Sequence, residues 1–307
     1  MNKLKNIWHP LPYDEWKETL GTLHLFTQII GKIRLALMPM QVEWAQIPFS
    51  LTSRGITSDR MPVSFGSIDI TFDFITHDLF IHASNGRSIS FPLSGKSVAE
   101  FYKEVFSALK ELGVELEINP MLVEMKVPVK MDTDDVNKTY DESAVRKWWQ
   151  ILILTGNVFT EFRSRFSGKM SPVNMWWGSF DLAITFFSIG QIKTQPGMDL
   201  LYRVAMDTGQ ITIGFWPGSD DFPEPAFFGY TYPKPEGYEK SLIKPEEAFW
   251  SDEKGEFFLK YETVRNSPDP EKMLTDFCQS IFDSGVELSG WDKEACEYKP
   301  PIEKPKI

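Results

Sequence analysis

The sequence predicts an α+β protein made of two similar halves, each built as a helix, an antiparallel sheet and a closing helix. Three observations lead to this fold class. Apolar residues recur at helical spacing in 13–37, strand-type alternation follows in 67–76, and the same order of elements returns after residue 142. With 307 residues, the chain is long enough for two domains of ordinary size.

The first half begins with the helix over 13–37, and a strand is expected over 47–54. Residues 67–76 alternate between apolar and polar side chains, which is typical of an antiparallel strand with one buried face. Asn85-Gly86 predicts a tight hairpin turn, because both residues tolerate positive φ.

A second helix closes the first half. Ser97 and Glu100 form a capping-box pattern at its start, and Gly113 is suited to its C-terminal cap. A short strand is expected over 114–118.

The second half repeats this order after an acidic segment, 126–142, that is poor in apolar residues. Helices are expected over 143–166 and 269–284, and a long strand over 175–187. Further strands are expected over 210–216, 226–232, 248–250 and 256–261. Residues 200–206 fit either a helix or a strand.

The domain organisation that follows has an N-terminal α+β half at 1–125, an acidic linker at 126–142, a C-terminal α+β half at 143–292 and a flexible tail at 293–307. Short repeats indicate internal duplication. Gly-Val-Glu-Leu occurs at 113–116 and at 285–288, each time after the expected closing helix, and Phe-x-Leu occurs at 49–51 and 180–182. Chance is the alternative, because the tetrapeptide combines ordinary cap and strand residues.

Charge and composition exclude several function classes. The net charge of −11, without an internal run of basic residues, disfavours nucleic acid as a partner. The apolar stretches are too short for a membrane span, and the first residues lack the apolar core of a secretory signal. We therefore expect a cytoplasmic protein with no membrane partner. Cys278 and Cys296 are too few for a disulfide framework, and Cys278 fits the buried face of the last helix.

The chain carries no recognisable cofactor or metal motif. Residues 94–97 resemble the end of a phosphate-binding loop, but the earlier glycine is a serine, Ser90. The four histidines are spread over separate expected elements, which disfavours a metal centre. We expect no cofactor and no metal ligand.

Two stretches are unusual enough to suggest a site. The first is the polar side of the 13–37 helix, which has no carboxylate and consists of His24, Thr27, Gln28, Lys32 and Arg34. Gly31 lies on the same side and allows close approach of a backbone or ligand. The alternative is structural, because cations near a helix C-terminus complement the helix dipole and His24 can bond a neighbouring carbonyl.

The second stretch is 175–187, where Asp181 interrupts an apolar strand. Strand alternation places Trp177, Ser179 and Asp181 on the face opposite the core side chains. An aspartate in such a setting either has a buried partner or borders a cavity, and an arginine or histidine of the 13–37 helix is a natural partner.

Six stretches together are similar to an uncharacterised bacterial family, the domain of unknown function 5996. They read LHLFTQIIGKIRLAL, LTSRGITS, IDITFDFITHDL, GKMSPVNMWWGSFDLAITFFS, GFWPG and PAFFGYTYPKP, and the resemblance extends from Trp8 to Trp291. It covers both unusual stretches and Arg54, but it implies no known reaction. It also implies a histidine where this chain has Asn174, so chemistry that needs an imidazole there is not expected.

The leading functional hypothesis is that the protein binds a small polar or anionic molecule in a cleft between the two halves, with acid/base chemistry if it is an enzyme. The candidate proton-transfer residues are His24 and Asp181. The candidate ligand-binding residues are Gln28, Lys32, Arg34, Arg54, Asn174, Trp177, Ser179 and Trp216. The alternative is a non-catalytic interaction protein that uses aromatic surface patches such as GFWPG and FFGYTYPKP. The sequence leaves the oligomeric state open.

Overall fold

The computed structural model describes residues 7–124, 129–192, 197–198 and 200–296. Its helices and antiparallel strands make an α+β fold, in agreement with the fold class that the sequence predicts. The chain divides into two compact units. Unit 1 comprises Met1–Leu154, Val173–Ala183 and Phe215–Pro225, and unit 2 comprises Thr155–Pro172, Ile184–Gly214 and Ala226–Ile307.

The helices of unit 1 begin and end close to the expected residues. They are α1 (Tyr13–Leu37), α2 (Val98–Leu112) and the first half of α3 (Glu142–Arg163), with single 3-10 turns η1 (Val42–Trp44) and η2 (Met131–Thr133). The capping box of α2 is present, because Ser97 Oγ accepts from Glu100 N–H while the Glu100 carboxylate accepts from Ser97 N–H. Gly113 ends α2 with a φ of 86°.

The sheet of unit 1 is antiparallel throughout. Its strands are β1 (Phe49–Leu51), β2 (Gly55–Thr57), β3 (Met61–Val63), β4 (Gly66–Asp73), β5 (Asp78–Ala83), β6 (Ser88–Pro92), β7 (Asn174–Trp176) and the start of β8 (Asp181–Gln191). The strand order is β8-β7-β1-β2-β4-β5-β6, and β3 pairs with β4. Gly86, with a φ of 88°, makes the predicted turn between β5 and β6.

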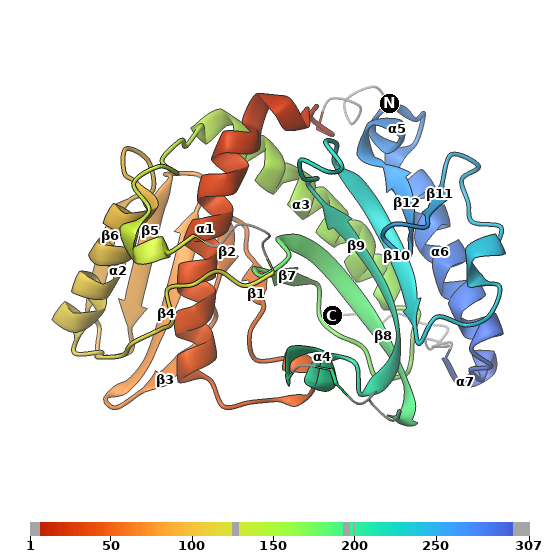
Figure 1. Cartoon of the computed structure of the whole chain (residues 1–307), viewed down its shortest axis with the longest axis horizontal. Coiled ribbons are helices and arrows are strands. Elements are labelled where there is room, and N and C mark those ends of the chain that lie inside the picture. Colours follow the sequence, from red (N-terminus) through yellow and green to blue (C-terminus); the bar gives the residue numbers. More distant parts are fainter. Residues whose placement is uncertain (1–6, 125–128, 193–196, 199, 297–307) are drawn as a thin grey trace, which may run out of the picture. The chain divides into compact units, whose positions relative to one another are not determined.

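Both α1 and α2 lie on the same face of this sheet (Figure 1). That face is apolar: the ring of Phe72 on β4 lies 6.3 Å from that of Phe101 on α2, and Phe101 also stacks on Phe26 of α1. Because side chains alternate along a strand, the partner positions of the opposite face carry Ser50, Thr57 and Thr71 instead. The core of unit 1 is therefore between the sheet and the two helices.

Two strand predictions need correction. Residues 114–118 form no strand, because Val114 N–H turns back to the Leu109 carbonyl at the end of α2. The expected strand over 175–187 is a hairpin, in which β7 and β8 pair across the β7–β8 turn (177–180). Phe180 occupies this turn with a φ of 60°, which reverses the chain. The run of apolar residues through the turn concealed it in the sequence, because Trp177 and Phe180 are buried there by α1 and α3.

Unit 2 contains the rest of α3 and of β8, together with the remaining elements of the chain. These are α4 (Leu200–Ala205), β9 (Thr208–Trp216), β10 (Ala226–Tyr232), η3 (Tyr238–Lys240), β11 (Phe249–Ser251), β12 (Glu256–Lys260), α5 (Tyr261–Asn266), α6 (Pro270–Leu288) and α7 (Lys293–Cys296). The strand order is β8-β9-β10-β12-β11. The undecided segment 200–206 is thus largely helical. Asp269 caps α6 by accepting from Lys272 N–H, and Cys278 is fully buried on this helix, as predicted.

Internal duplication is not confirmed. The second Gly-Val-Glu-Leu copy, 285–288, forms the last turn of α6, whereas the first copy follows the end of α2. Gly285 lies within this helix, where a Cβ atom would be 2.6 Å from Ile211 Cδ1 of β9. The domain boundaries of the sequence analysis remain a prediction. Residues 125–128 of the linker region and 297–307 of the tail lie outside the described residues.

Candidate functional site

The polar side of α1 is covered by the β7–β8 turn. Gly31 makes this contact possible: a Cβ atom at this position would lie 2.1 Å from Cδ2 of Trp177. The Trp177 indole is buried, and its Nε1–H donates to the Ile47 carbonyl at 3.0 Å. The close approach expected at Gly31 is therefore made by the indole of Trp177.

His24 binds the backbone of the same turn. Its Nε2 lies 3.1 Å from the Trp177 carbonyl oxygen and 2.9 Å from that of Gly178. Because carbonyls only accept, Nε2 carries the proton of a neutral imidazole. The ring also packs on Phe180, with centroids 4.9 Å apart. Burial lowers the pKa of His24 to about 4, although the two carbonyl bonds favour the charged form. His24 is thus a neutral donor that holds the turn.

Gln28 fixes a second segment against α1. Its Nε2–H donates to the Val123 carbonyl at 2.8 Å, and its Oε1 accepts from Val123 N–H at 3.0 Å. The next residue, Glu124, lies against the turn, since a Cβ on Gly178 would be 2.8 Å from Oε2 of Glu124. Both hydrogen-bonding groups of the Gln28 carboxamide are therefore used by the protein itself.

Asp181 begins β8 directly after the turn and is 7% exposed. Burial raises the pKa of Asp181 to about 7; the hydroxyl of Ser179, which donates to the carboxylate, opposes this shift, and the charge of Glu124 adds to it. Among the described residues, no hydrogen bond or ion pair joins His24 to Asp181, the two proposed proton-transfer residues. Sequence reasoning missed Glu124, which lies at the edge of the expected linker.

Arg34 differs from the residues above because its donors are not satisfied. It is 5% exposed, and within the described part of the chain neither Nε nor Nη1 has a hydrogen-bond partner. The nearest carboxylate oxygen is Asp59 Oδ2, 3.8 Å from Nη2. Burial lowers the pKa of Arg34, and the charge of Asp59 acts in the opposite direction.

Asp59 connects Arg34 to the polar face of the sheet. Ser50 Oγ on β1 donates to Asp59 Oδ2 at 2.7 Å. Ser50 in turn pairs with Asn174 on β7, so their side chains point to the same face. Asn174 is 7% exposed, and its carboxamide makes no hydrogen bond to any described residue. We call Arg34, Asp59, Ser50 and Asn174 the Arg34 site.

Sequence reasoning identified Arg34 and Asn174 but missed Asp59 and Ser50. Their role depends on the register that places Ser50 between Thr57 and Asn174, and no local motif encodes that pairing.

The other candidates have separate environments, although all ten candidate residues lie in unit 1. Arg54 is half exposed and forms an ion pair with Asp73, which also caps the backbone of Ile75 and Thr76. The ring of Trp216 packs against Phe222, 5.9 Å away.

Lys32 is buried and has no ion pair with any described residue, and burial lowers its pKa. It lies two positions from Arg34, about 200° around the helix, and therefore flanks Trp177 on the other side.

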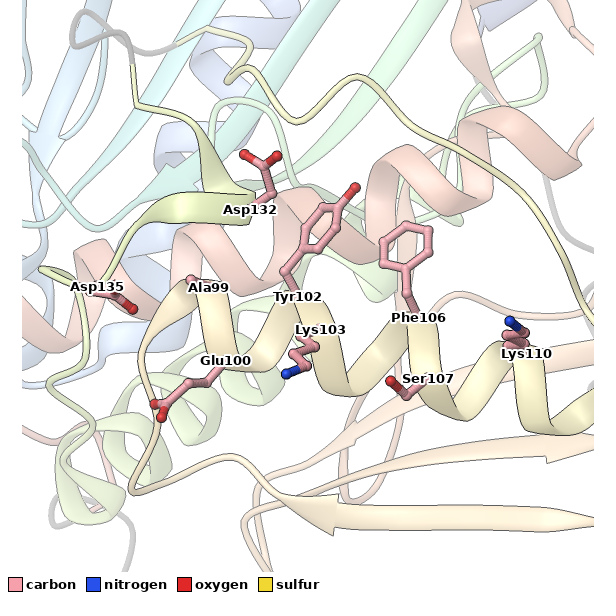
Figure 2. A pocket seen from close by; sticks show the side chains of 9 residues that line it. All are labelled: Ala99, Glu100, Tyr102, Lys103, Phe106, Ser107, Lys110, Asp132 and Asp135. Atoms are coloured by element: carbon pink, nitrogen blue, oxygen red, sulfur yellow. The ribbon is translucent and has the colours of Figure 1, made fainter.

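A separate groove lies along α2 (Figure 2). Its volume is about 620 Å³, and its lining residues are Ala99, Glu100, Tyr102, Lys103, Phe106, Ser107, Lys110, Asp132 and Asp135. The rings of Tyr102 and Phe106 stack, with centroids 4.5 Å apart (Figure 2). None of the residues predicted from the sequence lines this groove.

Within the described ranges, no cluster of three or more histidine, cysteine, aspartate or glutamate side chains is arranged to hold a metal ion. No helix among the described residues has both the length and the apolar character that a membrane crossing requires.

A family model described as a family of unknown function, DUF5996, matches residues 8–298. The chain belongs to the DUF5996 family. The match confirms the resemblance seen in the sequence and includes every residue of the Arg34 site. Comparisons with curated proteins and with solved structures gave no match. The chemistry of this DUF5996 protein therefore has to be inferred from its own residues.

Proposed function

We propose that this protein binds a small anionic molecule at the Arg34 site in unit 1. The observation that carries the proposal is the guanidinium of Arg34, which is buried while Nε and Nη1 lack acceptors among the described residues. Buried donors without partners are costly, by about 1–3 kcal/mol each for neutral groups and more for charged ones. A carboxylate or phosphate matches the planar donor set of arginine and removes that cost.

The surroundings of Arg34 support an anionic ligand. Asp59, at 3.8 Å, is beyond hydrogen-bond distance and is 46% exposed in its side chain, so it neutralises Arg34 only partly. Lys32 is a second buried cation of α1 without an ion pair among the described residues, but it lies about 200° around the helix from Arg34 and is not part of the Arg34 site.

Asp181 is the proton-transfer residue of this proposal. It pairs with Trp176, two residues along β7 from Asn174, so its position is on the same face of the sheet as Asn174. Its pKa of about 7 suits exchange of a proton near neutral pH. His24 is left out of this role, because its Nε2 proton is bonded to two backbone carbonyls.

Isothermal titration calorimetry with inorganic phosphate and with malonate tests the binding proposal. We expect the wild type to bind at least one of these probes, and Arg34→Met to weaken that binding at least tenfold. Arg60→Met is the matched control, because Arg60 is exposed and adjacent to Asp59 in sequence. Equal binding by Arg34→Met and wild type, or no binding of either probe to wild type, overturns the proposal.

The alternative of an interaction protein has less support. Its aromatic patches are largely interior, since Phe215, Phe227 and Phe228 are all buried. The aromatic side chains that these segments leave at the surface are Trp216, Tyr230 and Tyr232, and all three are half-buried. We therefore favour binding of a small molecule.

A further inference from the structure

A row of polar side chains extends from the Arg34 site across the sheet of unit 1. Pairing from β8 to β6 places seven residues side by side on the face opposite α1 and α2. They are, in order, Ala183, Asn174, Ser50, Thr57, Thr71, Phe80 and Ser90. Four neighbouring positions, Asn174 to Thr71, are hydrogen-bonding side chains, and we call these four the hydroxyl row.

The members of the hydroxyl row are ordered but keep hydrogen-bonding capacity. Thr71 Oγ1 donates to Thr57 Oγ1 at 3.0 Å, and Ser50 Oγ donates to Asp59. Ser50, Thr57 and Thr71 are half-buried. Each hydroxyl has one donor and two acceptor positions. Thr57 Oγ1 already accepts from Thr71 Oγ1–H and from Asp59 N–H, whereas no described residue donates a hydrogen bond to the acceptor positions of Ser50 and Thr71. The Asn174 carboxamide makes no hydrogen bond to any described residue.

The row has the length and the end groups needed for an extended hydroxylated ligand. Three strand spacings separate Asn174 from Thr71, which is about 14 Å. Asp59 joins the row to Arg34 at one point, through Ser50. At the other end, Phe80 follows Thr71, and its ring is nearly parallel to that of His82, with an interplanar angle of 15°. An aromatic face of this kind accommodates the C–H face of a sugar.

We propose that the anion held by Arg34 belongs to a polyhydroxylated molecule, a sugar phosphate or sugar acid, whose hydroxyl groups bond the hydroxyl row. This inference rests on the proposed function, because Arg34 supplies the charged contact. Asn174 and the hydroxyls of Ser50 and Thr71 provide recognition of the neutral part, and Thr57 orients Thr71 by accepting its hydroxyl proton. An alkyl phosphate has no hydroxyl groups to bond Asn174 and the acceptor positions of Ser50 and Thr71, so the row favours the hydroxylated ligand over it.

Calorimetry with matched probes tests this assignment. The hydroxylated probes are ribose 5-phosphate, glucose 6-phosphate and gluconate, and the control probes are propyl phosphate and inorganic phosphate. We expect the wild type to bind at least one hydroxylated probe tenfold or more tightly than propyl phosphate. In Thr57→Val and Thr71→Val this preference falls to threefold or less, while the affinity for inorganic phosphate changes less than twofold.

Two further variants keep the result interpretable. Thr71→Ser retains the hydroxyl and preserves the preference, and Thr275→Val, on the surface of α6, leaves it unchanged. If inorganic phosphate binds through Arg34 but no hydroxylated probe exceeds propyl phosphate, this inference fails and the proposed function stands. If no probe binds the wild type, both fail. A preference that survives in Thr57→Val and Thr71→Val also overturns the role of the row.

Discussion

The polar groups in the middle of α1 are hydrogen-bonded, whereas two donors near its C-terminal end have no hydrogen-bond partner in the described part of the chain. In the middle, His24 bonds the backbone of the β7–β8 turn and Gln28 bonds the backbone of Val123. Six residues after Gln28, nearly two turns further on, Arg34 is also buried but lacks acceptors for Nε and Nη1 within the described residues. Residues of one helix face, equally polar in the sequence, thus divide into those whose polar groups bond the protein backbone and one, Arg34, whose Nε and Nη1 lack partners among the described residues.

This difference teaches that burial alone does not identify a binding residue. His24, Gln28 and Arg34 are all largely removed from solvent. They differ in whether their donors and acceptors have hydrogen-bond partners among the described residues. A satisfied buried group stabilises the fold, whereas an unsatisfied one costs stability that a ligand can return. The predictions below test this division.

The largest effect is expected at Gly31, on which the satisfied region depends. In Gly31→Ala, the new methyl group overlaps the indole of Trp177 at 2.1 Å, so the indole must leave its buried position. We expect a loss of about 3–5 kcal/mol, similar to truncation of a buried tryptophan, despite the gain of about 1 kcal/mol in helix propensity. Chemical denaturation measures the change.

Gly21→Ala is the matched control on the same helix. A Cβ there meets only the Asn137 Oδ1 atom, at 3.9 Å, so this variant should gain up to about 1 kcal/mol. Equal stability of Gly31→Ala and Gly21→Ala would contradict the close packing of the Trp177 indole on Gly31.

The second prediction concerns pH and Asp181. Because its pKa is raised from 3.8 to about 7, the folded state retains a proton that the unfolded state loses from about pH 4 upward. The proton count is then higher in the folded state, and stability falls as pH rises to about 7, then levels off. We expect Asp181→Asn to remove this loss and to gain about 2–4 kcal/mol on the wild type between pH 4 and 8.

His24 provides an internal check on that measurement. Its pKa is lowered from 6.5 to about 4, so the unfolded state binds the extra proton and stability rises with pH over this window. The wild type therefore combines two opposite slopes, and Asp181→Asn should expose the rising one. Wild type and Asp181→Asn with parallel pH profiles would show that Asp181 is ionised throughout.

Much of the fold is predictable because local chemistry decides it. Tyr13–Leu37, the capping box at Ser97 and the turn at Gly86 follow from helical spacing, side-chain caps and positive φ. The β7–β8 turn was missed for a physical reason. Turns are usually polar, but this one is buried against α1, so Trp177 and Phe180 have the apolar character of a strand.

The candidate site was predictable only in part. An acid-free polar side on α1 is visible in the sequence, and so is an isolated Asp181, but which polar groups are satisfied depends on contacts far along the chain. The Gln28 carboxamide is bonded to the backbone of Val123, and Arg54 forms an ion pair with Asp73. Neither partner could be read from the sequence. Strand register, which brings Ser50 beside Asn174, cannot be read from short strands of three residues.

The third prediction tests the satisfied region at Gln28. Gln28→Met keeps the volume but leaves Val123 N–H and the Val123 carbonyl without their partners. We expect a loss of about 2 kcal/mol in the free energy of unfolding, measured by urea denaturation. Affinity for the anion probes should change less than twofold, because Gln28 is not part of the Arg34 site. A tenfold loss of affinity at unchanged stability would instead make Gln28 a ligand contact.

The smallest effect on stability, and the sharpest contrast with Gln28, is expected at Arg34. In Arg34→Met, an apolar chain of similar reach replaces a buried guanidinium whose Nε and Nη1 lack acceptors among the described residues. Among the described residues, the ion pair given up is the 3.8 Å contact with Asp59, whose side chain is 46% exposed. Without ligand, we expect stability to stay within about 1 kcal/mol of wild type or to increase, because replacing a poorly compensated buried charge by an apolar group is often favourable.

Addition of inorganic phosphate should make the wild type more stable than Arg34→Met, even if the variant is the more stable of the two without ligand. Phosphate at 100 times its dissociation constant raises the unfolding free energy of wild type by about 2.7 kcal/mol and leaves Arg34→Met unchanged. Thermal denaturation with and without phosphate measures both. A loss of several kcal/mol in Arg34→Met without ligand would place Arg34 with His24 and Gln28 among the groups that hold the fold, and the division between the middle and the C-terminal end of α1 would no longer stand.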